Sequence, residues 1–177
     1  MIRKAISGLV AALAVIAATL LGTASPAVAE VSGPWVMQPY TSDLCIHPTN
    51  YSSASGVVVE QTLCESRVDR DWNFQTINAG YYRISYRNGG KCLAVSGSST
   101  ANSAKIVTQA CGNPTLNDNW LPIRNFSAGD LDYYLLYNRH SGKCLNVKGN
   151  STAIGGDLIQ YTCNTAANNE SFTWNRP

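Results

Sequence analysis

The chain has 177 residues, a formal net charge of +2 and only 14% charged side chains. No Lys/Arg cluster of the kind that nucleic-acid binders carry is visible, so this class is excluded. The length suits one ordinary domain with a single core.

The N-terminal segment, 1–29, is predicted to be a secretory signal peptide. Two basic residues precede an apolar, alanine-rich run over 5–21, and Ala-Val-Ala at 27–29 fits a signal-peptidase site. A membrane anchor is the alternative, but the run is marginal for a crossing of about 20 residues, and no basic stop-transfer cluster follows it. The mature chain, 30–177, is therefore expected to be extracellular, without a membrane span and with a net charge near zero.

The six cysteines reveal a repeat. They form three pairs whose members are 19 positions apart, and successive pairs begin 47 and 52 positions apart. An aromatic residue follows each pair by 8 or 9 positions. An even cysteine count in an exported chain is typical of disulfides, although sequence alone allows many pairings. The repeat symmetry favours Cys45–Cys64, Cys92–Cys111 and Cys144–Cys163, in approximate repeats 34–78, 79–126 and 130–177.

Each repeat is predicted to consist of short β-strands. In the second repeat, aromatic and apolar residues predict a strand over 81–86, and Asn-Gly-Gly at 88–90 predicts a turn. The chain returns over 91–95, and further strands are expected over 106–111 and 120–123. No convincing helical periodicity appears in the mature chain.

Three such units are expected to share one core. A unit of about 50 residues with few large apolar side chains cannot bury its apolar face alone, and a propeller needs at least about four units. The predicted fold class is all-β: a β-trefoil of three tandem four-stranded repeats with one disulfide in each. The recurring Trp72, Trp120 and Phe172 are predicted core residues, and Trp35 and Trp174 are predicted to bring the terminal strands together.

The repeated pattern resembles the ricin B-chain lectin family, which includes modules of exported glycoside hydrolases. The resemblance rests on Cys-Leu-x-Val at 92–95 and 144–147, a strand ending in cysteine 19 residues later and the aromatic beyond it, and it covers about 36–174. It implies a carbohydrate-binding β-trefoil with a shallow site in each repeat. The family's Gln-x-Trp mark appears here as Arg70-Asp71-Trp72, Asp118-Asn119-Trp120 and Glu170-Ser171-Phe172.

The resemblance implies three parts for each site: an acid after the first cysteine, an aromatic two before the second, and an Asn beside the Gln. A sugar packs its C–H face on an aromatic ring, and its hydroxyls bond to carboxylate and amide groups. The third repeat is the most complete. It has Asn146 in the acid position, Tyr161 in the aromatic position, Asn169 in the amide position and Glu170 in place of Gln.

The other two repeats are less complete. In the first, His47 and Asp69 are weaker candidate contacts, and Tyr51 is the substitute for a missing aromatic. In the second, Ala94 occupies the acid position and Gln109 the aromatic position. Because alanine offers no side-chain hydrogen bond, this repeat is expected to be structural.

The expected function is a secreted lectin for galactose-type or xylan-type glycans that is not an enzyme and needs no metal or cofactor. The closest carboxylate pairs, Asp69 with Asp71 and Asp130 with Asp132, fall in predicted loops, and a small trefoil offers no deep cleft for them. Neither the cysteine spacing nor the two histidines match a zinc site.

The expected partners are a glycan or polysaccharide and, because one domain fills the mature chain, a separate enzyme or toxin subunit. One alternative stays open: a protein-docking module or protease inhibitor. Its loops, 113–119 or 127–132, would meet a protein, and the sugar positions would be vestigial.

Overall fold

The computed structural model describes residues 31–65 and 71–176. The predicted signal peptide, 1–29, and the candidate contact Asp69 lie outside the described residues. Within the described ranges, no helix has the length and apolar character needed to cross a membrane.

The described chain folds into strands β1 to β12, connected by loops and single 3-10 turns. The all-β prediction is therefore confirmed. The strands are β1 (Val31–Pro39), β2 (Cys45–Pro48), β3 (Val59–Thr62), β4 (Trp72–Thr76), β5 (Tyr82–Tyr86), β6 (Cys92–Val95), β7 (Ile106–Gln109), β8 (Asn119–Ala128), β9 (Leu131–Asn138), β10 (Cys144–Val147), β11 (Leu158–Tyr161) and β12 (Ser171–Asn175).

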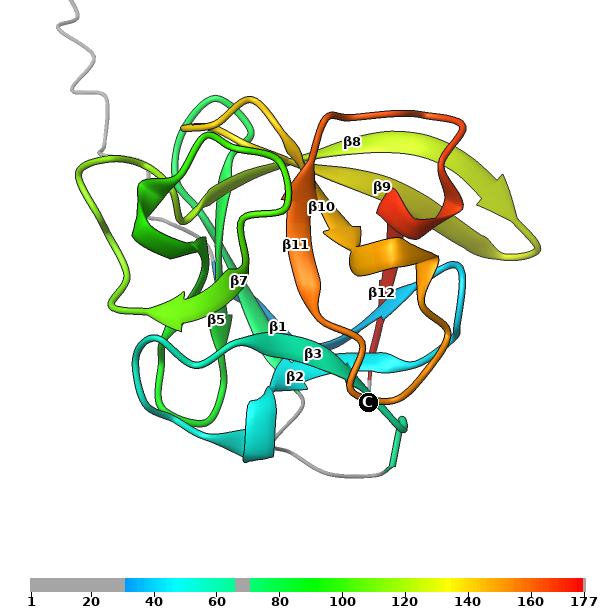
Figure 1. Cartoon of the computed structure of the whole chain (residues 1–177), viewed down its shortest axis with the longest axis horizontal. Helices are drawn as coiled ribbons and strands as arrows, with labels where there is room; N and C mark the ends of the chain where they lie inside the picture. The colour runs from blue at the N-terminus through cyan, green and yellow to red at the C-terminus, as the bar shows by residue number, and fades with distance from the viewer. Residues whose placement is uncertain (1–30, 66–70, 177) are drawn as a thin grey trace, which may run out of the picture.

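Six strands close into a barrel. Antiparallel pairing runs from β1 to β4, β5, β8, β9 and β12, and β12 returns to β1. The remaining six strands form three hairpins: the first (β2–β3), the second (β6–β7) and the third (β10–β11). Figure 1 looks onto these hairpins, which surround the centre of the view. A six-stranded barrel with three hairpins is the arrangement of a β-trefoil.

The predicted elements of the second repeat are found with small shifts. The turn at 88–90 is present, and Gly89 and Gly90 both adopt positive φ there. The strand predicted over 120–123 is longer, because β8 continues to Ala128 in a long antiparallel ladder with β9. The length of this ladder depends on the partner strand, which the sequence of β8 alone does not reveal.

The three hairpins have the same register. In each, the first cysteine pairs with the residue that lies two positions before the second cysteine: Thr62, Gln109 or Tyr161. The disulfides join Cys45 to Cys64, Cys92 to Cys111 and Cys144 to Cys163, as predicted.

The recurring aromatics lie in the core, as predicted. Trp72, Trp120 and Phe172 are fully buried. The indole N–H of Trp72 donates to the backbone oxygen of Ile46 (3.1 Å), and that of Trp120 donates to the oxygen of Leu93 (2.8 Å). Each indole thus attaches a hairpin to the barrel by a buried hydrogen bond.

The hairpins also hold one another in a closed cycle. A buried polar side chain near the end of each hairpin's second strand donates to a backbone oxygen in the loop of another hairpin. The bonds run from Gln61 to Ser151 (3.0 Å), from Gln160 to Ala101 (2.8 Å) and from Thr108 to Ala54 (2.8 Å).

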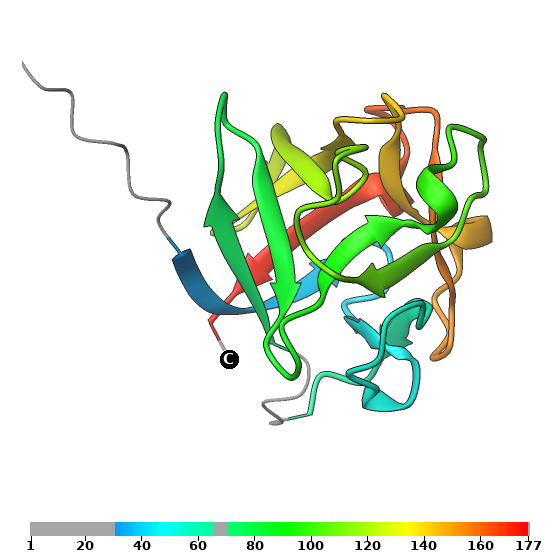
Figure 2. The ribbon, with the colours of Figure 1, turned by 90° about the vertical axis from the view of Figure 1, so that its left-hand side faces the viewer.

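The two described ends of the chain meet in the barrel wall. β1 pairs with β12, with Met37 opposite Trp174, and Trp35 lies opposite Trp72 on the other side of β1. Figure 2 shows β1 beginning and β12 ending at the same end of the barrel. Trp35 and Trp174 therefore lie where the terminal strands join, as predicted.

Candidate functional site

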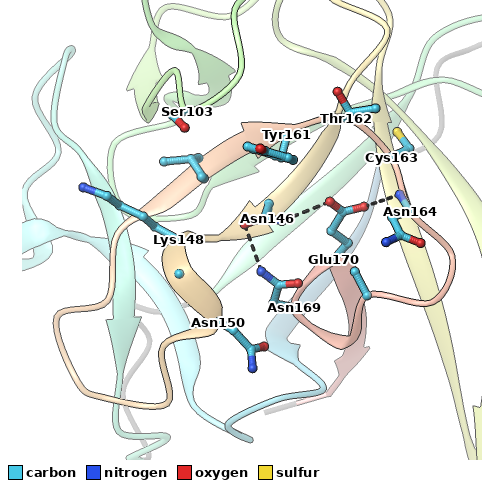
Figure 3. Close-up of a pocket in the computed structure, with 13 residues that line it drawn as sticks. Ser103, Asn146, Lys148, Asn150, Tyr161, Thr162, Cys163, Asn164, Asn169 and Glu170 are labelled. Atoms are coloured by element: carbon cyan, nitrogen blue, oxygen red, sulfur yellow. Dashed lines mark hydrogen bonds between the residues drawn. The ribbon is translucent and has the colours of Figure 1, made fainter.

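A depression of about 600 Å³ lies on the third hairpin. Its walls come from β10, β11 and two 3-10 turns, η4 (Lys148–Asn150) and η5 (Asn168–Glu170). Figure 3 shows its lining side chains. All four site residues predicted for the third repeat line it: Asn146, Tyr161, Asn169 and Glu170.

Strand alternation places Asn146 in this depression. In β10, Leu145 and Val147 are fully buried in the core, so Asn146 points from the opposite face of the strand. Gly149 follows in η4 with φ 64°, a conformation that glycine adopts without steric cost. This turn brings the chain back along the rim of the depression.

Glu170 is a buried carboxylate at the base of the site, with 1% of its surface exposed. Its Oε1 accepts from Asn146 Nδ2 (3.0 Å) and its Oε2 from the backbone N–H of Asn164 (2.7 Å). Burial raises the pKa of Glu170, and these two hydrogen bonds oppose the rise. The carboxylate therefore fixes both the asparagine and the loop after Cys163.

Asn169 completes the polar cluster. Its Nδ2 donates to Asn146 Oδ1 (3.1 Å) and to the backbone oxygen of Val147 (2.8 Å). Its own Oδ1 has no hydrogen-bond partner among the residues that the structure describes. Figure 3 shows the chain of side chains from Asn169 through Asn146 to Glu170. The cluster therefore presents a fixed amide oxygen to a ligand.

Tyr161 forms an aromatic side of the depression. It lies opposite Cys144 at the end of β11, and 43% of its surface is exposed. The wall continues into Ser103, which belongs to a loop of the second hairpin. An exposed ring beside anchored amide groups offers the two contacts that a sugar needs.

The second hairpin has a buried carboxylate in the same position, but the amide of its asparagine is bonded to a neighbouring side chain. Asp118 accepts from the backbone N–H of Gly112 (2.6 Å), as Glu170 does from Asn164. Gln109, at the position of Tyr161, donates to Asn117 Oδ1 (2.9 Å) and accepts from its Nδ2 (3.2 Å). Ala94, at the position of Asn146, has no polar side-chain atom, so the described residues of this hairpin offer no free amide oxygen at the corresponding point.

In the first hairpin, the polar side chains also contact one another. His47 is 4% exposed, and its Nε2 lies 3.5 Å from Glu60 Oε1. The Tyr51 ring packs on the His47 ring with 4.4 Å between centroids. Thr49 Oγ1 donates to Glu60 Oε2 (3.0 Å). The structure brings His47 and Tyr51 together, whereas Asp69 lies outside the described residues.

Of the carboxylates singled out in the sequence, Asp71 and Asp132 each pair with an arginine, and Asp69 lies outside the described residues. Asp71 is buried and bonds to Arg87 (2.9 Å). Asp132 Oδ1 accepts from Ser127 (2.6 Å) and Arg124 (2.8 Å), and these contacts lower its pKa. Within 31–65 and 71–176, no group of three His, Cys, Asp or Glu side chains is placed to hold a metal.

Several lining residues could not be identified from the repeat pattern. Lys148 and Asn150 lie in a loop whose shape depends on η4, and Asn164 contributes through its backbone N–H. Ser103 comes from a different repeat. The weak signal for Lys148 and Asn150 was their position directly after Cys-Leu-x-Val.

Comparisons with known proteins agree with this architecture. The sequence matches the family described as ricin-type beta-trefoil lectin domain-like over 29–109, 68–161 and 116–176. No curated protein matches the chain in sequence.

Solved structures of similar fold include a designed threefold-symmetric protein, ThreeFoil, at 28% identity and TM-score 0.73, covering 81% of this chain and 98% of that one. An exo-beta-1,3-galactanase from Clostridium thermocellum matches at 20% identity and TM-score 0.72, covering 82% of this chain and 30% of that one. The C-half of an earthworm R-type lectin in complex with GalNAc matches at 11% identity and TM-score 0.61, covering 82% and 100%. The chain belongs to the ricin-type β-trefoil lectin-like family.

Proposed function

We propose that this chain is a secreted lectin that binds galactose-type or xylan-type glycans through the third hairpin and has no catalytic activity. The observation that carries the proposal is the depression in which the exposed Tyr161 ring lies beside the anchored Asn146, Asn169 and Glu170. The R-type lectin among the similar structures was solved with GalNAc, and another similar structure is a galactanase.

The polar cluster supports this proposal through an exchange of groups. The family pattern has an acid in the position of Asn146 and a glutamine in that of Glu170. Here the amide and the carboxylate have changed places, and they are joined by a 3.0 Å hydrogen bond. The exchange keeps one negative charge in the cluster, and the bond to buried Glu170 orients the amide of Asn146 toward sugar hydroxyls.

A shallow site of this kind binds one sugar weakly, so useful affinity requires a polymeric glycan or several sites. We propose the mature form Glu30–Pro177, and the equivalent hairpin registers support the three predicted repeats. A separate enzyme or toxin subunit remains the proposed further partner.

The test is a glycan array with mature Glu30–Pro177, followed by calorimetric titration of the best glycan. Three variants accompany it. Tyr161→Ala removes the aromatic surface, Tyr161→Phe keeps the ring, and Gln109→Ala changes the corresponding position of the second hairpin. Circular dichroism establishes that each variant is folded.

The expected result is binding that Tyr161→Ala weakens at least about tenfold, because the stacking surface is lost. Tyr161→Phe and Gln109→Ala should bind nearly as the unmodified protein does. Binding that survives Tyr161→Ala would move the site elsewhere in the molecule. If folded, oxidised protein binds no glycan, the lectin proposal fails and a protein-docking function becomes the better explanation.

A further inference from the structure

A second depression, of about 380 Å³, lies in the barrel itself. It has no residue in common with the depression on the third hairpin. Its volume falls within the usual range of small-molecule sites, about 300–1,000 Å³. We call it the barrel mouth and define it by one side chain from each barrel strand: Trp35, Phe74, Tyr82, Leu121, Tyr134 and Trp174.

Aromatic rings form most of this wall in a fixed arrangement. Trp174 stacks on Tyr134 with 4.6 Å between centroids, and Phe74 lies 5.0 Å from Trp174. Tyr82 follows at 6.0 Å from Phe74. Phe74 is buried, whereas the other three rings are partly exposed. Rings held by their neighbours offer C–H contacts to a sugar without losing conformational entropy.

Hydrogen-bond donors are also available in the barrel mouth. Among the described residues, neither Trp174 Nε1 nor the Tyr82 hydroxyl has a hydrogen-bond partner. Trp35 Nε1 makes only a long bond to Ser32 Oγ (3.4 Å). A purely apolar ligand would leave these donors unmatched on burial, whereas sugar hydroxyls would accept from them.

A third, more polar depression borders the barrel mouth. It measures about 200 Å³ and also contains Tyr134 and Trp174 in its wall. Asp130 and Asn175 add a carboxylate and an amide to its lining. The two shared rings thus lie near groups that bind hydroxyls.

We propose that the barrel mouth is a second carbohydrate site, which takes a short neutral oligosaccharide and makes a single chain bivalent. The choice of ligand class rests on the proposed function, whereas the position of the site does not. The two sites can therefore be tested separately.

The tryptophans provide a readout for this site alone. The chain has four: Trp72 and Trp120 are fully buried, and Trp35 and Trp174 line the barrel mouth. The depression on the third hairpin contains none. A ligand in the barrel mouth should change tryptophan emission, and a ligand on the third hairpin should not.

The experiment titrates mature Glu30–Pro177 and its Tyr161→Ala variant with xylotetraose and with β-1,3-galactobiose while emission is recorded. A saturable change of the same midpoint in both proteins is expected. Trp35→Ala should weaken the effect at least about tenfold by removing a wall. Tyr82→Phe, which keeps the ring and thus the fold, should weaken it about fivefold by removing one hydrogen bond.

Three results of the sugar titration would overturn the proposal: no emission change with either sugar, a change that disappears in Tyr161→Ala, or a midpoint that Tyr82→Phe and Trp35→Ala leave unaltered. A separate titration with decanoate would also overturn it if decanoate binds in the barrel mouth and neither sugar displaces it, since this would identify an apolar ligand. Failure of the third-hairpin site alone would leave the emission change intact.

Discussion

The second and third hairpins have the same backbone register and a buried acid at the same position, Asp118 in one and Glu170 in the other. Of the two, only the third has an open polar site. In both, a carboxylate accepts from the backbone N–H that follows the second cysteine, and an asparagine donates to the backbone oxygen of a valine. These shared bonds hold the hairpin to the barrel. They are structural and do not by themselves make a binding site.

The difference lies in two positions of the hairpin. Asn146 and Tyr161 in the third hairpin correspond to Ala94 and Gln109 in the second. Gln109 makes two hydrogen bonds to the amide of Asn117, whereas Tyr161 makes none to Asn169, whose amide oxygen has no hydrogen-bond partner among the described residues. A repeat can therefore lose its site and keep its fold, because different residues carry the two properties.

The largest effect is expected from Asn146→Asp. This change places a second carboxylate against buried Glu170, where Asn146 now donates at 3.0 Å. Two like charges in a buried pair should destabilise the fold by about 3–5 kcal/mol at pH 7. Thermal unfolding measures the loss, which should shrink at pH 4 because one carboxyl can take up a proton. Equal stability at both pH values would show that the two groups do not interact.

Removing one disulfide at a time distinguishes effects on stability from effects on glycan binding. Cys144→Ala/Cys163→Ala and Cys92→Ala/Cys111→Ala each open a loop of the same length, so each should cost about 3 kcal/mol in denaturant unfolding. Only the first pair should abolish glycan binding at the third hairpin, because Cys163 and the loop after it line that depression. Equal loss of binding in both would place the glycan elsewhere.

Glu170→Gln should have a smaller effect. An amide has one oxygen, so it cannot accept from both Asn146 Nδ2 and the backbone N–H of Asn164. Leaving one buried donor unmatched should cost about 1–3 kcal/mol in chemical unfolding. Asn146→Asp/Glu170→Gln restores both bonds with the groups exchanged, and it should recover most of the stability. If the double variant is no more stable than either single variant, the two groups cannot be exchanged with both hydrogen bonds kept.

The same side chain should also give stability a dependence on pH. Burial raises the pKa of Glu170 above its ordinary value of 4.5, so the folded chain holds more protons than the unfolded chain just above that pH. The free energy of unfolding should fall as the pH rises through this window, and the Glu170→Gln variant should lack this contribution. The destabilisation caused by Glu170→Gln should therefore be greater at pH 4 than at pH 7. Calorimetry at pH 4 and pH 7 measures this difference. A greater destabilisation at pH 7 would show that the pKa of Glu170 is lowered and not raised.

The smallest change in stability is expected when the third site is copied onto the second hairpin. Gln109→Tyr, made in the Tyr161→Ala background, removes both hydrogen bonds between Gln109 and Asn117 and supplies a ring, while fully buried Ala94 is left unchanged. Unfolding should shift by less than about 1 kcal/mol, because Gln109 is only partly buried. Glycan binding by titration should return. Continued absence of binding would show that Asn146, Lys148 or another residue of the third hairpin is also required.

Much of the site could be predicted because its frame is local. The position of Asn146 depends on the two-residue period of β10, and that of Tyr161 depends on its pairing with Cys144 inside one hairpin. The family resemblance defines both positions by their spacing from the cysteines. The lining by Ser103 could not be predicted, because it comes from another repeat and arrives only when the hairpins meet.

The sequence by itself determined the all-β class, the three disulfide pairs, the buried aromatics and the membership of Asn146, Tyr161, Asn169 and Glu170 in one cluster. The disulfide pairs and the buried aromatics recur with the cysteine period, whereas the four site positions follow from the resemblance to the ricin-type family. Only the tertiary structure decided that Glu170 is buried and bonded to Asn146, that Gln109 closes the second hairpin, and that six strands bring aromatic rings together in the barrel mouth. The reason is physical: burial and contacts between distant strands arise when the barrel closes, and no single repeat contains them.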